Sequence, residues 1–114
     1  MARVLTPRAV RWESVAAEEV HPGVARQVLD GERQTLVRYV YQPGAVFPVH
    51  DHTEEQITVV VSGRIRFTVA GETVELAAGG AAVIPSGTPH GAVVVGDEVV
   101  ETFNTLSPRR QRHP

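Results

Sequence analysis

A chain of 114 residues is long enough to bury one hydrophobic core but too short for two, which predicts a single domain. The net charge of −2 and its dispersed charges exclude a basic stripe for nucleic acid, and no apolar run approaches the roughly 18 residues of a membrane span. Because the sequence has no cysteine, disulfides and thiolate ligands are excluded. We therefore expect a cytoplasmic protein that binds neither nucleic acid nor membranes.

The first third of the chain favours extended structure. Residues 9–20 fit either a short helix after Pro7 or an edge strand around Val10–Trp12, and we favour the extended form. Two runs rich in β-branched and aromatic residues follow, and the turn signal Asp30-Gly31 lies between them. These runs are Val24–Leu29 and Gln34–Tyr41. We predict that they pair as a hairpin.

Short apolar strands and turn residues alternate through the rest of the chain. Turns rich in glycine or proline separate most of these strands, which recur about every ten residues. The predicted strands are 57–61, 64–70, 73–76, 81–84, 90–95 and 99–106. This regular spacing is typical of an all-β sandwich or barrel.

Three of the five histidines fall within two ordered patterns. The patterns are Gly44-x5-His50-x-His52-x3-Gln56 and Gly79-x5-Pro85-x-Gly87-x2-His90. Residues two apart on a strand point to the same face, so we expect His50 and His52 to aim at one point, and Gln56 keeps their parity. Imidazoles with an amide oxygen suit zinc, nickel, manganese or ferrous iron. The sequence therefore predicts one divalent metal ion of unspecified identity.

Both patterns resemble the two signature motifs of the cupin family. These motifs read glycine-x5-His-x-His-x3,4-Glu-x6-glycine, which ends here at Gly63, and glycine-x5-Pro-x-glycine-x2-His-x3-Asn. Two positions differ: Gln56 stands where the family usually has a glutamate ligand, and Val94 stands in place of the asparagine. The resemblance implies an all-β double-stranded β-helix, or jelly-roll barrel, with metal ligands His50, His52, Gln56 and His90.

The resemblance also divides the chain. It covers about residues 35–106, which we assign to the cupin barrel core. Residues 1–34 would supply N-terminal strands that cover the barrel or a dimer interface, and residues 107–114 would form a C-terminal tail. All three parts belong to one domain.

The strand at residues 57–61 carries apolar residues on both faces. If Gln56, Thr58 and Val60 face the interior, the β-branched Ile57, Val59 and Val61 face outward, and such an apolar stripe is costly to expose. Burial against a second subunit explains it, and the family resemblance also implies a dimer, so we expect a homodimer. Coverage by residues 1–20 of the same chain is the alternative.

The neutral ligand set indicates the chemistry of the site. Three imidazoles and an amide leave the full +2 charge of the ion uncompensated, which attracts anions, polarises carbonyls and disfavours a ferric intermediate. We therefore expect a Lewis-acid enzyme that performs isomerisation, ring opening, cyclisation or elimination on a small oxygenated anion. A cupin dioxygenase and a non-catalytic small-ligand or metal-binding cupin are the alternatives. Glu54 and Glu55 are expected at the surface, since Glu55 has the opposite parity to Gln56.

The C-terminal strand resembles that of the small cupins of pectin breakdown that linearise unsaturated uronates. Their tail reads Asp-x-Phe-Ser-Pro-Pro-Arg, and here it reads Asn104-Thr-Leu-Ser-Pro-Arg-Arg110. Arg110 is a candidate for pairing with a substrate carboxylate, Asn104 for orienting the substrate by hydrogen bonds, and Tyr41 for supplying a proton. The aromatic residues expected to pack inside the barrel are Tyr39, Tyr41, Phe47, Phe67 and Phe103.

Overall fold

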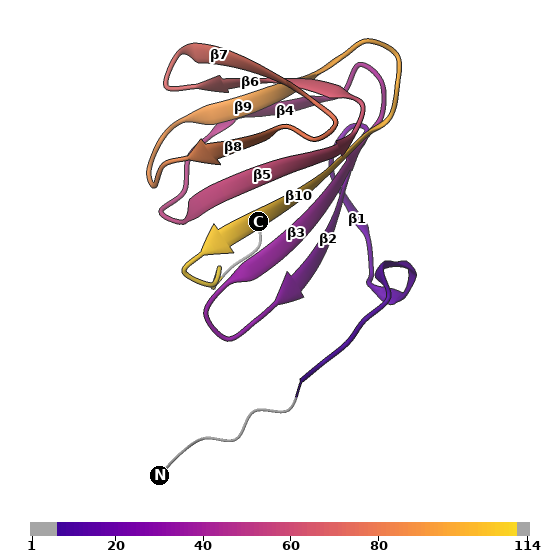
Figure 1. Cartoon of the computed structure of the whole chain (residues 1–114), viewed down its shortest axis with the longest axis vertical. Coiled ribbons are helices and arrows are strands. Elements are labelled where there is room, and N and C mark those ends of the chain that lie inside the picture. The colour runs from indigo at the N-terminus through magenta and orange to yellow at the C-terminus, as the bar shows by residue number, and fades with distance from the viewer. Residues whose placement is uncertain (1–6, 112–114) are drawn as a thin grey trace.

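The computed structural model describes residues 7–111, which form two β-sheets that face each other (Figure 1). A short 3-10 turn, η1 (Trp12–Ser14), precedes the strands. The strands are β1 (Glu18–His21), β2 (Val24–Asp30), β3 (Thr35–Tyr41), β4 (Val46–His50), β5 (Glu55–Ser62), β6 (Arg64–Val69), β7 (Glu72–Ala77), β8 (Ala81–Ile84), β9 (His90–Val95) and β10 (Val100–Ser107).

One sheet has six strands in the order β1-β2-β3-β10-β5-β8, and the other has four in the order β4-β9-β6-β7. Every neighbouring pair is antiparallel. The predicted hairpin is confirmed, because β2 pairs with β3 from Val24 opposite Tyr41 to Asp30 opposite Thr35. The chain crosses between the sheets several times, as in a jelly roll, and the all-β jelly-roll prediction is confirmed.

The core lies between the sheets and is built by alternation along each strand. In β3 and β10 nearly every second residue is buried, and in β5 the buried residues are Gln56, Thr58 and Val60, as parity predicts. Ile65 from β6 and Ile84 from β8 are fully buried. Each such side chain contributes about 1.5–3 kcal/mol by leaving water. The core therefore fixes the strands whose ends carry the polar residues of the site.

The N-terminal segment packs on the outer face of the six-stranded sheet. The ring of Trp12 lies 5.5 Å from that of Phe103, and the Gln27 side-chain amide donates to the backbone carbonyls of Trp12 and Val15. Two predictions were therefore wrong. The edge strand lies at Glu18–His21 and not around Val10–Trp12, where residues 10 and 11 are irregular and Trp12 begins η1. Phe103 faces outward because its parity is opposite to that of the buried Asn104.

An apolar patch remains exposed on the same outer face. Its members are Ile57 at 40%, Val59 at 42%, Val61 at 46% and Val83 at 58% exposure. Ile57 lies directly opposite Val83 across the β5–β8 ladder, so the patch is continuous. The alternative prediction was that residues 1–20 of the same chain cover this patch. Residues 7–20 leave it exposed, and residues 1–6 lie outside the described part of the chain.

The turn between β5 and β6 shows why the first motif ends in glycine. Gly63 has a φ of +75°, and a Cβ there would lie 2.7 Å from the Val99 carbonyl oxygen. Any side chain would therefore collide with the backbone that leads into β10. Within residues 7–111, no helix is long and apolar enough to cross a bilayer.

Candidate metal centre

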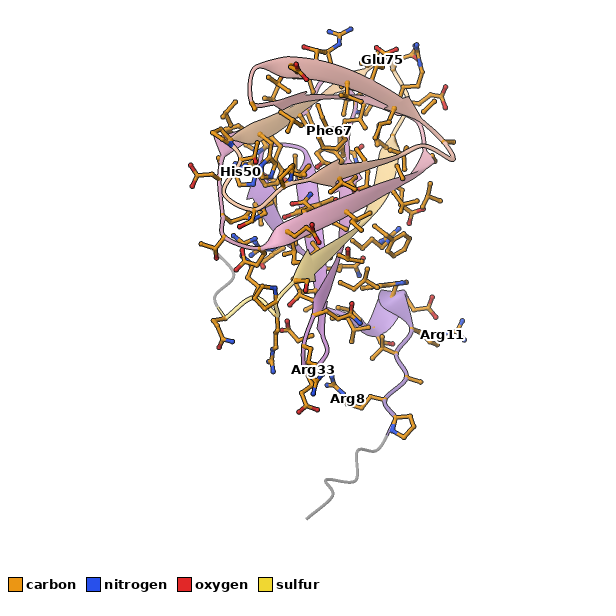
Figure 2. All side chains as sticks on the ribbon, turned by 60° about the vertical axis from the view of Figure 1, so that its left-hand side comes forward. Arg8, Arg11, Arg33, His50, Phe67 and Glu75 are labelled. Carbon is orange, nitrogen blue, oxygen red and sulfur yellow. The ribbon has the colours of Figure 1, made fainter. Side chains whose placement is uncertain are left out.

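His50 and His90 are brought together by strand pairing. His50 ends β4, His90 begins β9, and the two residues are direct partners in the β4–β9 ladder, with ring centroids 4.3 Å apart. Figure 2 shows His50 toward one end of the barrel. Two histidines that are 40 positions apart in the sequence thus become neighbours through the register of one antiparallel pair.

His52 reaches the same point from a loop. The prediction that His50 and His52 aim at one point is confirmed, but its reason, a shared strand face, was wrong, because β4 ends at His50 and Gln56 belongs to β5. The loop before β9 holds this turn in place: the Gly87 amide donates to the His52 carbonyl at 2.8 Å, and the Ser86 hydroxyl donates to the Thr53 carbonyl at 2.5 Å. The second glycine-proline motif therefore positions the loop of the first.

A backbone carbonyl fixes the tautomer of each histidine. The Nδ1 atom lies 3.0 Å from the Pro48 oxygen in His50, 3.0 Å from the Glu54 oxygen in His52 and 2.8 Å from the Thr88 oxygen in His90. A carbonyl only accepts hydrogen bonds, so Nδ1 carries the proton and Nε2 keeps its lone pair. All three rings are therefore prepared to bind a metal through Nε2.

The three rings face one another closely. One ring nitrogen from each of His50, His52 and His90 lies within 4.8 Å of the others, so the three could together hold a metal ion. The Nε2 atom of His90 is buried and has no hydrogen-bond partner among the described residues. An unpaired buried nitrogen is costly, and an ion bound there would remove that cost. The residues present therefore fit a metal site.

The amide of Gln56 turns its oxygen toward this cluster. Its Oε1 lies 3.1 Å from Nε2 of His52, while its Nε2 donates to the Thr58 hydroxyl at 2.9 Å and to Oδ1 of Asn104 at 3.2 Å. Because Nε2 of His52 is an acceptor, two acceptors face each other at 3.1 Å. A cation that binds both would turn this repulsion into attraction.

Asn104 lies beneath Gln56 and is already saturated. Its Oδ1 also accepts from Thr58 at 2.7 Å, and its Nδ2 donates to the Val37 carbonyl and to Thr102. Only 2% of Asn104 is exposed. These bonds hold Asn104 against Gln56, which is a predicted metal ligand. The contact of Asn104 with a substrate stays a prediction.

Glu54 and Glu55 differ in their surroundings. Glu55 is exposed, as parity predicts, and stands away from the histidines. The carboxylate of Glu54 lies 3.5 Å from Nδ1 of His52, and its side chain is only 14% exposed. Glu54 therefore supports the orientation of His52 from the side that faces away from Gln56.

Burial keeps His50 and His90 neutral. It lowers the pKa of His50 to about 4, and the neighbouring His90 and His52 add to this effect against the opposing bond to Pro48. The pKa of His90 is also lowered, and burial is again the main cause. Neutral imidazoles bind metal without first losing a proton, so His50 and His90 can bind an ion at neutral pH.

A narrow hollow lies between the sheets at the histidines, and a larger cleft adjoins it. The hollow has a volume of about 20 Å³ and is lined by the three histidines, Gln56 and Tyr41, among others. The cleft has about 360 Å³, and the two share Tyr39, Phe47, His50 and Arg110. The backbone amide of Arg110 donates to the Thr35 hydroxyl at 3.0 Å, and the pairing of its guanidinium with a substrate carboxylate stays a prediction.

The two tyrosines differ in access. Tyr41 is 3% exposed and lines the hollow but not the cleft, whereas Tyr39 lines both. Burial raises the pKa of both hydroxyls above the ordinary range, and for Tyr39 the charges of Arg26 and Arg110 oppose this effect. Both therefore stay protonated at neutral pH.

The sequence analysis did not single out Arg26, which lines the cleft. Its side chain is 5% exposed, and it has the same strand parity as the fully buried Val24. From the sequence alone, this parity does not show which face of the strand is buried, because the adjacent Gln27 is buried as well. Arg38 and Arg66 lie on outer faces, where they pair with Glu101 and Glu75.

A jelly-roll barrel with three converging histidines defines a metal-binding cupin. The comparison with protein families agrees, since the cupin domain matches residues 37–106. This match spans more than half of the chain, and the chain therefore belongs to the cupin family.

The similarity to other proteins covers much more of the chain than the two motifs. An uncharacterized protein of Streptomyces coelicolor is 29% identical over 84 residues, which make up 73% of this chain and 80% of that protein. The solved structure of KdgF from Halomonas sp. is 30% identical, with a TM-score of 0.82 over 93% of this chain and 97% of KdgF. An RmlC-like cupin from Shewanella frigidimarina is 28% identical, with a TM-score of 0.82 over 93% and 95% of the two chains.

Proposed function

We propose that this chain is an enzyme that holds one divalent metal ion at His50, His52, His90 and Gln56 and acts on a small, oxygenated anion. The observation that carries the proposal is the buried Nε2 of His90, which lies beside two other histidines and has no hydrogen-bond partner within residues 7–111. When bound, the ion would supply Lewis-acid chemistry by polarising a carbonyl or hydroxyl oxygen of the substrate.

The charge of the site supports an anionic substrate. All four proposed ligands are neutral, and no aspartate or glutamate of the described chain lines the hollow or the cleft. Arg110 lines both and adds a positive charge near the histidines. A planar guanidinium pairs with a carboxylate through two parallel hydrogen bonds, and this is the role we assign to Arg110.

Residues of the chain would orient the substrate, donate a proton and exclude water. The Asn104 amide cannot take up a proton as a carboxylate can, so it orients groups by hydrogen bonding, as it does with Gln56. Proton donation falls to a hydroxyl, and Tyr41, which lines the hollow, is the candidate. The aromatic and apolar walls formed by Phe47, Phe67 and Leu106 exclude water around the reacting atoms.

The neutral ligands favour isomerisation, ring opening, cyclisation or elimination over oxidation. The similarity to KdgF and the resemblance to the uronate-linearising cupins support a sugar-acid substrate class. The replacement of their acidic residue by Asn104 separates this chain from them in its proton transfer. A dioxygenase of the same fold would instead require oxygen and iron.

The first test concerns the metal. We expect about one divalent ion per chain by elemental analysis, and its loss in the His50→Ala/His90→Ala double variant. His21→Ala is the matched control, because His21 lies on β1 outside the cluster and should leave the metal content unchanged. Equal metal content in the double variant and the wild type would refute the metal site.

The second test concerns the reaction. Uronates, keto acids and enols would be screened under anaerobic conditions with zinc as the only metal. Turnover under these conditions is expected for a Lewis-acid enzyme. Activity that requires both oxygen and iron would replace the proposal with the dioxygenase, and ligand binding without turnover would replace it with a binding protein.

A further inference from the structure

The hollow at the histidines is too small for a whole substrate. Its volume of about 20 Å³ is close to the space that one water molecule needs. Only one donor group of a ligand can therefore reach the histidines. The rest of the ligand must lie in the adjoining cleft of about 360 Å³, which shares His50, Phe47, Tyr39 and Arg110 with the hollow.

A row of polar residues crosses the inner face of three strands at this cleft. Glu18 on β1 is the direct partner of Arg26 on β2, and Arg26 is the direct partner of Tyr39 on β3. Arg26 and Tyr39 line the cleft, although they are only 5% and 8% exposed. Side chains of directly paired residues point to the same face, so the row is set by strand register.

Arg26 is held rigidly in this row. Its Nε and Nη2 atoms both donate to one oxygen of Glu18, at 3.1 and 2.6 Å. The Glu18 side chain is 61% exposed, so the carboxylate lies toward water while the guanidinium lies inside. These two bonds leave the Nη1 edge of the guanidinium for another acceptor.

Tyr39 places a hydroxyl beside that guanidinium. Arg26 lies near enough to hydrogen bond to the hydroxyl, which it would do as the donor. The proton of the hydroxyl is then left to donate to a further group. The ring itself is fixed edge-on against Phe47, with centroids 5.4 Å apart.

We propose that Arg26 and the Tyr39 hydroxyl form a carboxylate-binding subsite in the cleft, distinct from Arg110 and from the histidines. Within the described chain the cleft is lined by two arginines and by no carboxylate, and its other walls include the apolar Val20 and Pro48. The ligand that fits is an elongated acid. It carries an oxygen donor at one end for the metal, a carboxylate at the other end, and a hydrocarbon segment against Phe47.

This subsite rests on the proposed metal-dependent function and narrows its substrate class. A compact acid such as oxalate would not reach from the hollow into the cleft. Two keto diacids with five and six carbons, 2-oxoglutarate and 2-oxoadipate, serve as probes. Their partners are 2-oxovalerate and 2-oxohexanoate, which have the same lengths and the same keto acid end but lack the distal carboxylate.

Calorimetric titration of the zinc-loaded protein tests the subsite. At least one diacid should bind about tenfold more tightly than its monoacid partner, and Arg26→Gln or Tyr39→Phe should abolish that preference while monoacid affinity changes less than about twofold. Arg38→Gln is the matched control, because Arg38 lies on the outer face of the same sheet and should keep the preference.

The outcomes separate the subsite from the metal site. No diacid preference, whether or not the probes bind, would overturn the subsite, as would a preference that survives both Arg26→Gln and Tyr39→Phe. Monoacid binding that depends on zinc supports the metal site in either case. A preference that persists in metal-free protein would support the subsite and count against the role of the metal.

Discussion

Oδ1 of Asn104 accepts a hydrogen bond from Nε2 of Gln56 at 3.2 Å, and this contact fixes which end of the Gln56 amide faces the histidines. Thr58 completes the arrangement, because its hydroxyl accepts from Gln56 and donates to Asn104. The amide therefore cannot rotate by half a turn without breaking two bonds. Thr58 and Asn104 therefore hold a neutral oxygen against His52 through their bonds to the Gln56 amide.

This contact gives a prediction for Gln56→Glu. The new carboxylate would place an acceptor against Oδ1 of Asn104, where a donor stood, and we expect a loss of about 1–3 kcal/mol in the free energy of unfolding. Metal should be retained. Keto acid probes should bind more weakly, because the site loses one unit of positive charge. Thermal unfolding, elemental analysis and titration would measure these effects, and unchanged or tighter binding of the acids would contradict the charge argument.

The lowered pKa values of His50 and His90 predict how stability depends on pH. His50 stays neutral in the folded protein down to about pH 4, whereas in the unfolded chain it takes up a proton near pH 6.5. The unfolded state therefore binds more protons between these values, and the free energy of unfolding of metal-free protein should fall as the pH is lowered from about 6.5 toward 4.

Urea unfolding of the metal-free protein at pH 7, 6 and 5 would check this dependence. The midpoint should decrease at each step, and His50→Asn should make the decrease smaller because one of the two shifted histidines is gone. A midpoint that stays constant over this range would show that the histidines are not desolvated in the folded protein.

The apolar patch on β5 and β8 leads to a prediction about assembly. We propose that Ile57, Val59, Val61 and Val83 meet the same patch of a second copy in a homodimer, since this continuous face remains exposed in the single chain. Val59→Asp should place a charge in the interface and dissociate the dimer.

Sedimentation at micromolar concentration would test the dimer. Val93→Asp is the control, because Val93 has the same 42% exposure as Val59 but lies on the other sheet, and it should leave the assembly unchanged. A monomeric wild-type protein would refute the dimer.

Strand parity and motif spacing were sufficient to predict much of the fold. They predicted that Thr58 and Val60 face the interior while Val59 faces outward, and the glycine at the end of the first motif is explained by the turn at Gly63. They could not predict that His52 would reach the cluster from a loop. That placement depends on a hydrogen bond from Gly87, which is distant in the sequence.

The cleft could not be predicted from the sequence either, because it also depends on contacts between distant segments. Arg26 is a charged residue in a strand, and its alternation with neighbours leaves open whether it faces water or the interior. The pairing of β1, β2 and β3 aligns it with Glu18 and Tyr39, and this register is a property of the assembled sheet. A buried arginine becomes recognisable only when its partner on the next strand is known.

The final prediction concerns Gly91, the residue after His90 on β9. A Cβ at this position would lie 2.9 Å from the Phe47 carbonyl oxygen and 3.1 Å from the Val49 amide nitrogen, both on β4. These are backbone atoms, so Gly91→Ala must push β4 away from β9. His50 ends β4, and its placement against His90 depends on this pairing. We therefore expect Gly91→Ala to lower metal affinity at least about tenfold, together with stability.

Gly79→Ala separates this effect from a general loss of stability. Unlike Gly91, Gly79 has a positive φ of +89°, which disfavours alanine, but a Cβ there meets nothing within 4 Å, and Gly79 lies outside the β4–β9 ladder. Its substitution should cost about 1 kcal/mol of stability through the backbone alone and leave metal affinity unchanged. Competition against a zinc chelator would measure affinity in both variants, with thermal unfolding in parallel. If Gly91→Ala binds zinc as tightly as Gly79→Ala, the spacing of β4 and β9 does not set the geometry of the histidine cluster.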